Sequence, residues 1–156
     1  GPLVAALAGV PAGRMADRFG ARRMTFAGLI ALGLGCFTLS ALPRTFGIGG
    51  YLAPMVIITL GYAVFQTANN TVVMSDVAPD RRGVVSALLN LSRNLGLITG
   101  ASVLGAVFAL ASNSVDINTA HPEAVASGMR VTFRVAWGLI GIACLIALAS
   151  RRGDPA

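Results

Sequence analysis

Two groups of polar side chains interrupt otherwise apolar stretches of this 156-residue sequence, and their chemistry is hydrogen bonding rather than covalent catalysis. The groups are Tyr62, Gln66 and Asn70, and then Asn90, Arg93 and Asn94. Members of each group lie about one helical turn apart, so a helix would place them close together. Such groups can bind a polar solute inside a membrane protein, but amides also join membrane helices to each other. Both interpretations stay open for the amides, and all six residues are candidates for lining a cavity.

Arg93 is the most informative of these residues because it lies deep in an apolar stretch. Counted from Arg82 at 1.5 Å per residue, it lies about 16 Å along a helix, near the middle of a bilayer. An arginine at that depth costs about 2.5 kcal/mol or more on insertion scales, unless it faces a cavity or a partner. Either Arg93 snorkels and hydrogen-bonds a neighbouring helix, or it lines a cavity or a gate.

The surrounding sequence predicts an all-α transmembrane bundle. Apolar residues make up 55% and charged residues 12%, against about 25% charged in soluble domains, and the mean hydropathy is +0.76. Several uncharged runs reach the roughly 18–20 residues that span a bilayer. We expect a polytopic bundle of one partial and four full membrane helices, at about residues 1–12, 24–42, 51–75, 84–111 and 129–150. The arginines form short clusters between apolar runs, which is typical of membrane topology and not of nucleic-acid binding.

The charges between these segments alternate along the chain. The arginines between them are Arg14, Arg18, Arg22 and Arg23, then Arg44, then Arg81 and Arg82, and finally Arg151 and Arg152, whereas the fourth connector holds Asp116 and Glu123 and no arginine. The positive-inside rule places the first and third connectors and the C-terminal tail in the cytoplasm. We therefore expect an integral protein of a bacterial cytoplasmic membrane with a cytoplasmic C-terminus.

The first connector contains a motif that resembles the signature of a known protein family. Its residues Gly13, Ala16, Asp17, Arg18, Gly20, Arg22 and Arg23 form G-x-x-A-D-R-x-G-x-R-R. The motif is similar to the cytoplasmic-loop signature of the major facilitator superfamily. This resemblance implies a gating loop formed by Gly13, Asp17, Arg18, Gly20, Arg22 and Arg23, in which Asp17 and Arg18 help to switch between inward-facing and outward-facing states.

A second stretch, from Gly61 through Asp76–Gly83 to Asn90–Gly96, resembles the closing helices of the fourteen-helix drug:proton antiporters. A twelve-helix relative would fit the same helix count. On this resemblance the chain is the C-terminal part of a longer transporter. Glycines at G-x-x-x-G-like spacing, Gly96, Gly100 and Gly105, are candidates for close helix packing.

These features predict a secondary transporter that is not an enzyme, with proton-coupled export of drugs or other small molecules as the leading hypothesis. Its partners would be the lipid bilayer, the missing N-terminal half and a small-molecule substrate, without nucleic acid. No cofactor or metal site is indicated, and proton coupling is implied by the resemblance alone. No acid lies deep in an apolar run, so a coupling acid would lie outside this sequence. The alternatives are an importer or facilitator of another solute, or a small helical membrane scaffold.

Overall fold

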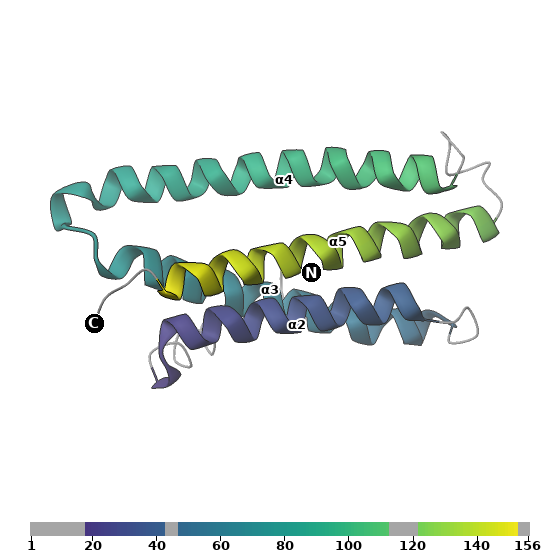
Figure 1. Cartoon of the computed structure of the whole chain (residues 1–156), viewed down its shortest axis with the longest axis horizontal. Coiled ribbons are helices and arrows are strands. Elements are labelled where there is room, and N and C mark those ends of the chain that lie inside the picture. The colour runs from purple at the N-terminus through teal and green to yellow at the C-terminus, as the bar shows by residue number, and fades with distance from the viewer. Residues whose placement is uncertain (1–17, 43–46, 113–121, 153–156) are drawn as a thin grey trace.

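Four long helices form an up-and-down bundle in a computed structural model that describes residues 18–42, 47–112 and 122–152. They are α2 (Ala21–Ala41), α3 (Gly47–Ser75), α4 (Arg82–Ser112) and α5 (Pro122–Arg152), with the short 3₁₀ helix η2 (Pro79–Arg81) before α4. The long helices lie roughly parallel to a common axis and alternate in direction (Figure 1). The described residues contain no strand. The partial helix expected at residues 1–12 lies outside them.

All four helices are long and apolar enough to cross a membrane, which confirms the expected all-α transmembrane class. Each begins a few residues before its expected start, and the largest difference is at α5, which begins at Pro122 rather than near Met129. Proline suits the first turn of a helix because its missing N–H would have no partner there. Residues 122–128 therefore extend the last helix and are not part of a connector.

Close packing between α2 and α3 forms the tightest part of the bundle. A Cβ atom placed on Gly28 would lie 2.5 Å from the backbone nitrogen of Phe65 and 2.8 Å from the carbonyl oxygen of Gly61. Gly35 lies in the same way against Ile58 and the backbone of Pro54. Glycines therefore allow the two backbones to approach more closely than any larger residue would permit.

Helix α5 packs against α2 on one side and α4 on the other. Trp137 of α5 contacts Phe37 of α2, with ring centroids 5.8 Å apart and planes inclined by 50°. Near the other neighbour, the Ser127 hydroxyl of α5 lies 3.2 Å from the Ala111 carbonyl oxygen of α4 and 2.8 Å from the Ala124 carbonyl oxygen of its own helix, so its one hydrogen is shared between the two acceptors. Helix α5 therefore connects α4 to the α2–α3 pair.

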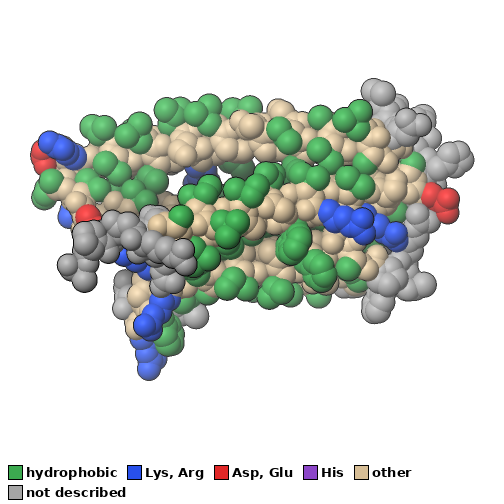
Figure 2. Space-filling view, viewed as in Figure 1, with side chains coloured by type: hydrophobic (Ala, Val, Ile, Leu, Met, Phe, Trp, Pro, Cys, Tyr) green, Lys and Arg blue, Asp and Glu red, His purple; other side chains and the backbone are tan. Residues whose placement is uncertain are grey.

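Most of the described surface is apolar, and the charges concentrate towards the helix ends (Figure 2). Large hydrophobic side chains such as Leu110, Leu145 and Ile98 are exposed by 83%, 67% and 66%. Such a surface is typical of contact with lipid or with further membrane helices. The bundle end that holds the start of α2 and of α4 carries Arg22, Arg23, Arg81 and Arg82.

Candidate functional site

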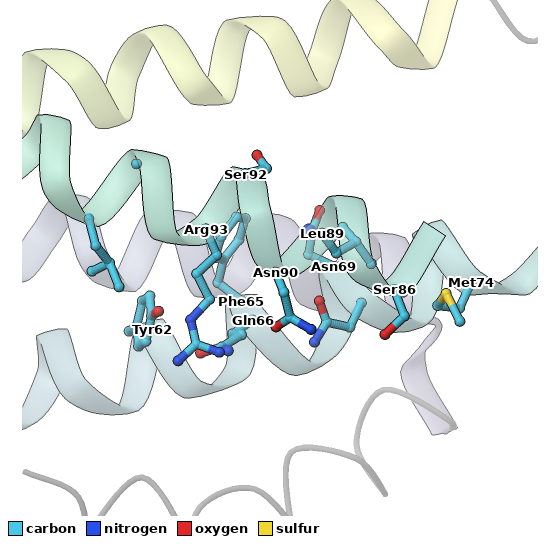
Figure 3. A pocket seen from close by; sticks show the side chains of 13 residues that line it. Tyr62, Phe65, Gln66, Asn69, Met74, Ser86, Leu89, Asn90, Ser92 and Arg93 are labelled. Atoms are coloured by element: carbon cyan, nitrogen blue, oxygen red, sulfur yellow. The ribbon is translucent and has the colours of Figure 1, made fainter. Parts of the chain in front are cut away.

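A cavity of about 460 Å³ lies between α3 and α4. The two helices follow each other in the chain but touch only sparsely, which leaves the space open. Its polar lining comes from Tyr62, Gln66, Asn69 and Asn70 of α3 and from Ser86, Asn90, Ser92 and Arg93 of α4. Apolar side chains complete it, namely Phe65, Met74, Leu89 and Leu97. Asn90 and Arg93 extend from α4 towards α3, where Tyr62 and Gln66 lie (Figure 3).

The structure brings together most of the polar residues that the sequence marked. Tyr62, Gln66, Asn70, Asn90 and Arg93 all line this one cavity. Asn94, one helical turn after Asn90, does not line it.

Three further polar residues of the cavity, Asn69, Ser86 and Ser92, were not among the predicted cavity-lining residues. A signal was available for Ser86, which precedes Arg93 by seven residues, or about two helical turns, and so shares its face. Asn69 and Ser92 lie next to predicted residues in the chain, and only the positions of the two helices show that they also line the cavity.

The cavity lies well inside the apolar part of the bundle. Arg93 is four residues from the midpoint of α4, or about 6 Å at 1.5 Å per residue. Gln66 is nine residues from the end of α3 at Ser75, or about 14 Å. These side chains are therefore at depths where polar groups need partners other than bulk water.

Within the described part of the chain, the large polar side chains of the cavity make no hydrogen bond or ion pair with the protein; these are Tyr62, Gln66, Asn69, Asn70, Asn90 and Arg93. Other polar residues of the bundle behave differently. Thr59 and Ser102, for example, donate to carbonyl oxygens four residues earlier on their own helices at 2.8 and 2.9 Å. The donors and acceptors of the cavity are thus available to water, to a solute or to further protein.

The predicted gating loop lies partly outside the described residues, which exclude Gly13 and Asp17. Gly20 precedes the first residue of α2. Its φ of +88° is a left-handed backbone conformation, which favours glycine. Arg22 and Arg23 lie in the first turn of α2 rather than in the connector. The guanidinium carbon of Arg18 lies 5.9 Å from the ring centroid of Phe19.

A hollow of about 440 Å³ joins this region to the end of α3. It is lined by Phe19, Gly20, Ala21, Arg22, Arg23, Thr71, Val72 and Ser75. The described part of the motif therefore lies against the same helix that lines the polar cavity, at the end nearer to the arginines.

The glycines expected to pack helices have no close neighbour in the described residues. A Cβ atom on Gly96, Gly100 or Gly105 would meet nothing within 4 Å. Their packing role stays a prediction that concerns protein outside these residues. The close crossing forms instead at Gly28 and Gly61, because α2 and α3 approach each other there.

Among the described residues, no acidic side chain lines the polar cavity. In the described residues the acids are Asp76, Asp80 and Glu123, and all three lie at helix ends or between helices. These residues also contain no group of three metal-binding side chains. The described part of the bundle therefore offers hydrogen-bond donors and a positive charge, without a membrane-embedded carboxylate.

A bundle of apolar helices with a cytoplasmic-loop motif and an intramembrane polar cavity agrees with the sequence comparison. Residues 2–155 match the Major Facilitator Superfamily. The chain belongs to this superfamily. No solved structure matches the chain.

Three curated relatives are transporters by name. The multidrug efflux pump LfrA of Mycolicibacterium smegmatis is 26% identical over 118 residues, which cover 75% of this chain and 23% of the relative. The uncharacterized transporter YebQ of Escherichia coli is 28% identical over 142 residues, which cover 84% of this chain and 30% of the relative. The riboflavin transporter RibZ of Clostridioides difficile is 26% identical over 108 residues, which cover 69% of this chain and 24% of the relative. The chain thus spans less than a third of the length of these relatives.

Proposed function

We propose that this chain forms part of a secondary active transporter that exports drugs or other small molecules in exchange for protons. The observation that supports this proposal most directly is the cavity between α3 and α4, whose large polar side chains make no hydrogen bond with the described protein. Unpaired amides and a guanidinium at membrane depth are costly unless they face water, solute or partner groups. A solute pathway supplies such partners.

In this proposal, α3 and α4 form one wall of the solute pathway, and further helices of the transporter close the other side. Alternating access would arise from two halves that rock about the central cavity. Arg18 before α2, together with Arg22 and Arg23 in its first turn, would hold the cytoplasmic ends of neighbouring helices in one of the two states. The partners are the lipid bilayer, the rest of the transporter and a small-molecule substrate, and the C-terminus would lie in the cytoplasm.

Proton coupling needs a group that takes up and releases a proton within the membrane. The carboxylates of the described spans, Asp80 and Glu123, lie only at the span ends, so this proposal places the coupling group outside the described residues. Support for efflux comes from the likeness to a multidrug efflux pump. A different solute is favoured by the relative that is named a riboflavin transporter, and we retain transport of another solute, inward or outward, as the second candidate.

Transport in everted membrane vesicles tests the proposal. Vesicles that contain the full-length protein are energised, and the uptake of an anionic dye, riboflavin and a cationic dye is followed with and without a protonophore. We expect proton-gradient-dependent uptake of at least one compound, and its loss in Gln66→Ala and Asn90→Ala variants that insert normally. Uptake that persists after the gradient is collapsed would contradict coupling to protons, and the absence of uptake for all three compounds would contradict this export function.

A further inference from the structure

The charge in the α3–α4 cavity has one sign. Among its lining residues Arg93 is the single ionised group, and the other polar members are amides, hydroxyls and a phenol. The acids of the described residues, Asp76, Asp80 and Glu123, lie outside this lining. The described wall of the cavity is therefore positively charged.

Arg93 also has unused binding capacity. Its guanidinium carries five N–H donors in a planar fork. It makes no hydrogen bond or ion pair with the described residues. A carboxylate or phosphate matches this fork with two parallel hydrogen bonds, which are stronger than neutral ones. At a depth where water is scarce, an anion compensates the charge of the guanidinium directly.

The other lining residues suit the remainder of such a ligand. Gln66 and Asn90 can donate and accept hydrogen bonds near the guanidinium (Figure 3). Phe65 and Tyr62 present aromatic rings, and Leu97 adds apolar surface. A volume of about 460 Å³ lies in the ordinary range of about 300–1,000 Å³ for small-molecule pockets. The lining thus combines one anion-binding end with an apolar, partly aromatic body.

We propose that the solute bound between α3 and α4 is an organic anion, whose carboxylate or phosphate is bound by Arg93 and whose apolar body lies against Phe65 and Tyr62. This inference rests on the proposed transport function and narrows its substrate class. Cationic compounds are disfavoured in this cavity because like charges repel at close range. An anionic lipid headgroup has the same phosphate chemistry, and the experiment below separates it from a solute.

A charge-selective labelling experiment measures the sign of the charge in the cavity and does not require the substrate to be identified. The full-length protein carries a single cysteine at residue 90, from Asn90→Cys, and is reconstituted in phosphatidylcholine vesicles that supply no anionic lipid. Its labelling rates with a sulfonate-bearing and a trimethylammonium-bearing methanethiosulfonate are divided by the rates for a free thiol in solution. The matched control has its single cysteine from Leu110→Cys, on the same helix but seventeen residues from Arg93 and 83% exposed in this structure.

We expect the sulfonate reagent to be favoured at residue 90, and Arg93→Gln to lower this preference about fivefold. This is the size expected for one charge about 8 Å away in a water-like dielectric, acting with opposite sign on the two reagents. Arg93→Lys keeps the charge and should keep the preference, which shows that a loss in Arg93→Gln is not caused by misfolding. The ratio of the two normalised labelling rates at residue 110 should be the same with and without Arg93→Gln. A preference for the cationic reagent at residue 90, or a ratio that does not depend on Arg93, would overturn the proposal, because it would mean that an acid elsewhere in the transporter already neutralises Arg93.

Ligand protection supplies the second arm. Fluorescein and tetramethylrhodamine methyl ester share a xanthene body but carry opposite charges at neutral pH. We expect fluorescein to slow labelling at residue 90 and the rhodamine ester to have a smaller effect. Equal protection by both dyes, or none by fluorescein, contradicts binding of an organic anion. If phosphatidylglycerol in the vesicles slows labelling and fluorescein does not, the anion is a lipid headgroup and the solute assignment is wrong.

The two proposals fail separately. Labelling does not depend on transport, so a positive result here alongside no vesicle uptake would contradict the transport function alone. Proton-driven uptake of the cationic dye, together with labelling that is independent of Arg93, would contradict the anion assignment alone.

Discussion

The contact between α2 and α3 depends on the absence of a side chain at Gly28, which makes Gly28→Ala a sharp test of the packing. The added Cβ atom would lie 2.5 Å from the nitrogen and 2.7 Å from the Cα of Phe65, and 2.8 Å from the carbonyl oxygen of Gly61. Ordinary contacts of a Cβ atom begin at 3.4 Å, so the three distances fall short by 0.6–0.9 Å. All three atoms belong to the backbone, so no side-chain rotation can relieve the overlap, and the helices must separate.

The magnitude follows from this geometry. Overpacking of a well-packed interface costs about 1–3 kcal/mol, and the upper part of this range applies because whole helices have to move. Alanine has a higher helix propensity than glycine, which offsets about 0.8–1.0 kcal/mol of this cost. We therefore expect Gly28→Ala to lower the free energy of unfolding by about 2 kcal/mol.

The measurement is the unfolding of the full-length protein in mixed micelles with increasing dodecyl sulfate, followed by circular dichroism. Gly138→Ala is the matched control, because its Cβ atom would meet nothing within 4 Å and it also lies within a long helix. Combining Gly28→Ala with Gly61→Ala should cost less than the sum of the single variants, since one separation of the helices relieves both overlaps. A Gly28→Ala protein as stable as the Gly138→Ala protein would refute the close crossing.

Three further outcomes are expected. Ser127→Ala should lower the free energy of unfolding by up to about 0.6 kcal/mol, the average for interhelical hydrogen bonds in a membrane, because its hydroxyl shares one hydrogen between the Ala111 carbonyl of α4 and the Ala124 carbonyl of its own helix. Equal unfolding midpoints of the two proteins would contradict the interhelical contact. In a double-mutant cycle, the effects of Trp137→Ala and Phe37→Ala on the free energy of unfolding should be coupled by about 0.5–1.5 kcal/mol, because the two rings are in contact. Effects that simply add would argue against this contact. A single cysteine introduced by Asp80→Cys should react with an impermeant maleimide only from the cytoplasmic side of oriented vesicles, as the arginines at this end predict; labelling from outside would invert the topology.

Much of the fold was accessible from the sequence because a bilayer makes composition decisive. Backbone groups in lipid must be satisfied within the helix, so a long uncharged run has few other structures available to it. The arginines between the runs then predict orientation. The ends of the helices were less accessible, since Pro122 and the polar residues after it could belong either to a loop or to the first turns of α5.

The cavity was only partly accessible for a different reason. Helical periodicity places Gln66 and Asn70 on one face of α3, and Ser86 and Arg93 on one face of α4. It does not say which faces of two helices meet, and so it could not separate Asn90, which lines the cavity, from Asn94, which does not. Likewise, G-x-x-x-G-like spacing drew attention to Gly96 and Gly100, while the contact forms at Gly28 and Gly61.

The sequence by itself thus determined the membrane class, the number of full spans, the superfamily likeness and the presence of a charged residue at membrane depth. Each of these depends on local properties, namely hydropathy, length and residue spacing along one helix. Tertiary structure alone decided that α3 and α4 leave a cavity between them, that Arg93 enters it together with Gln66 and Asn90, and that α2 and α3 cross at glycines. These outcomes depend on the rotation and separation of neighbouring helices, which are set by side-chain packing between segments far apart in the chain.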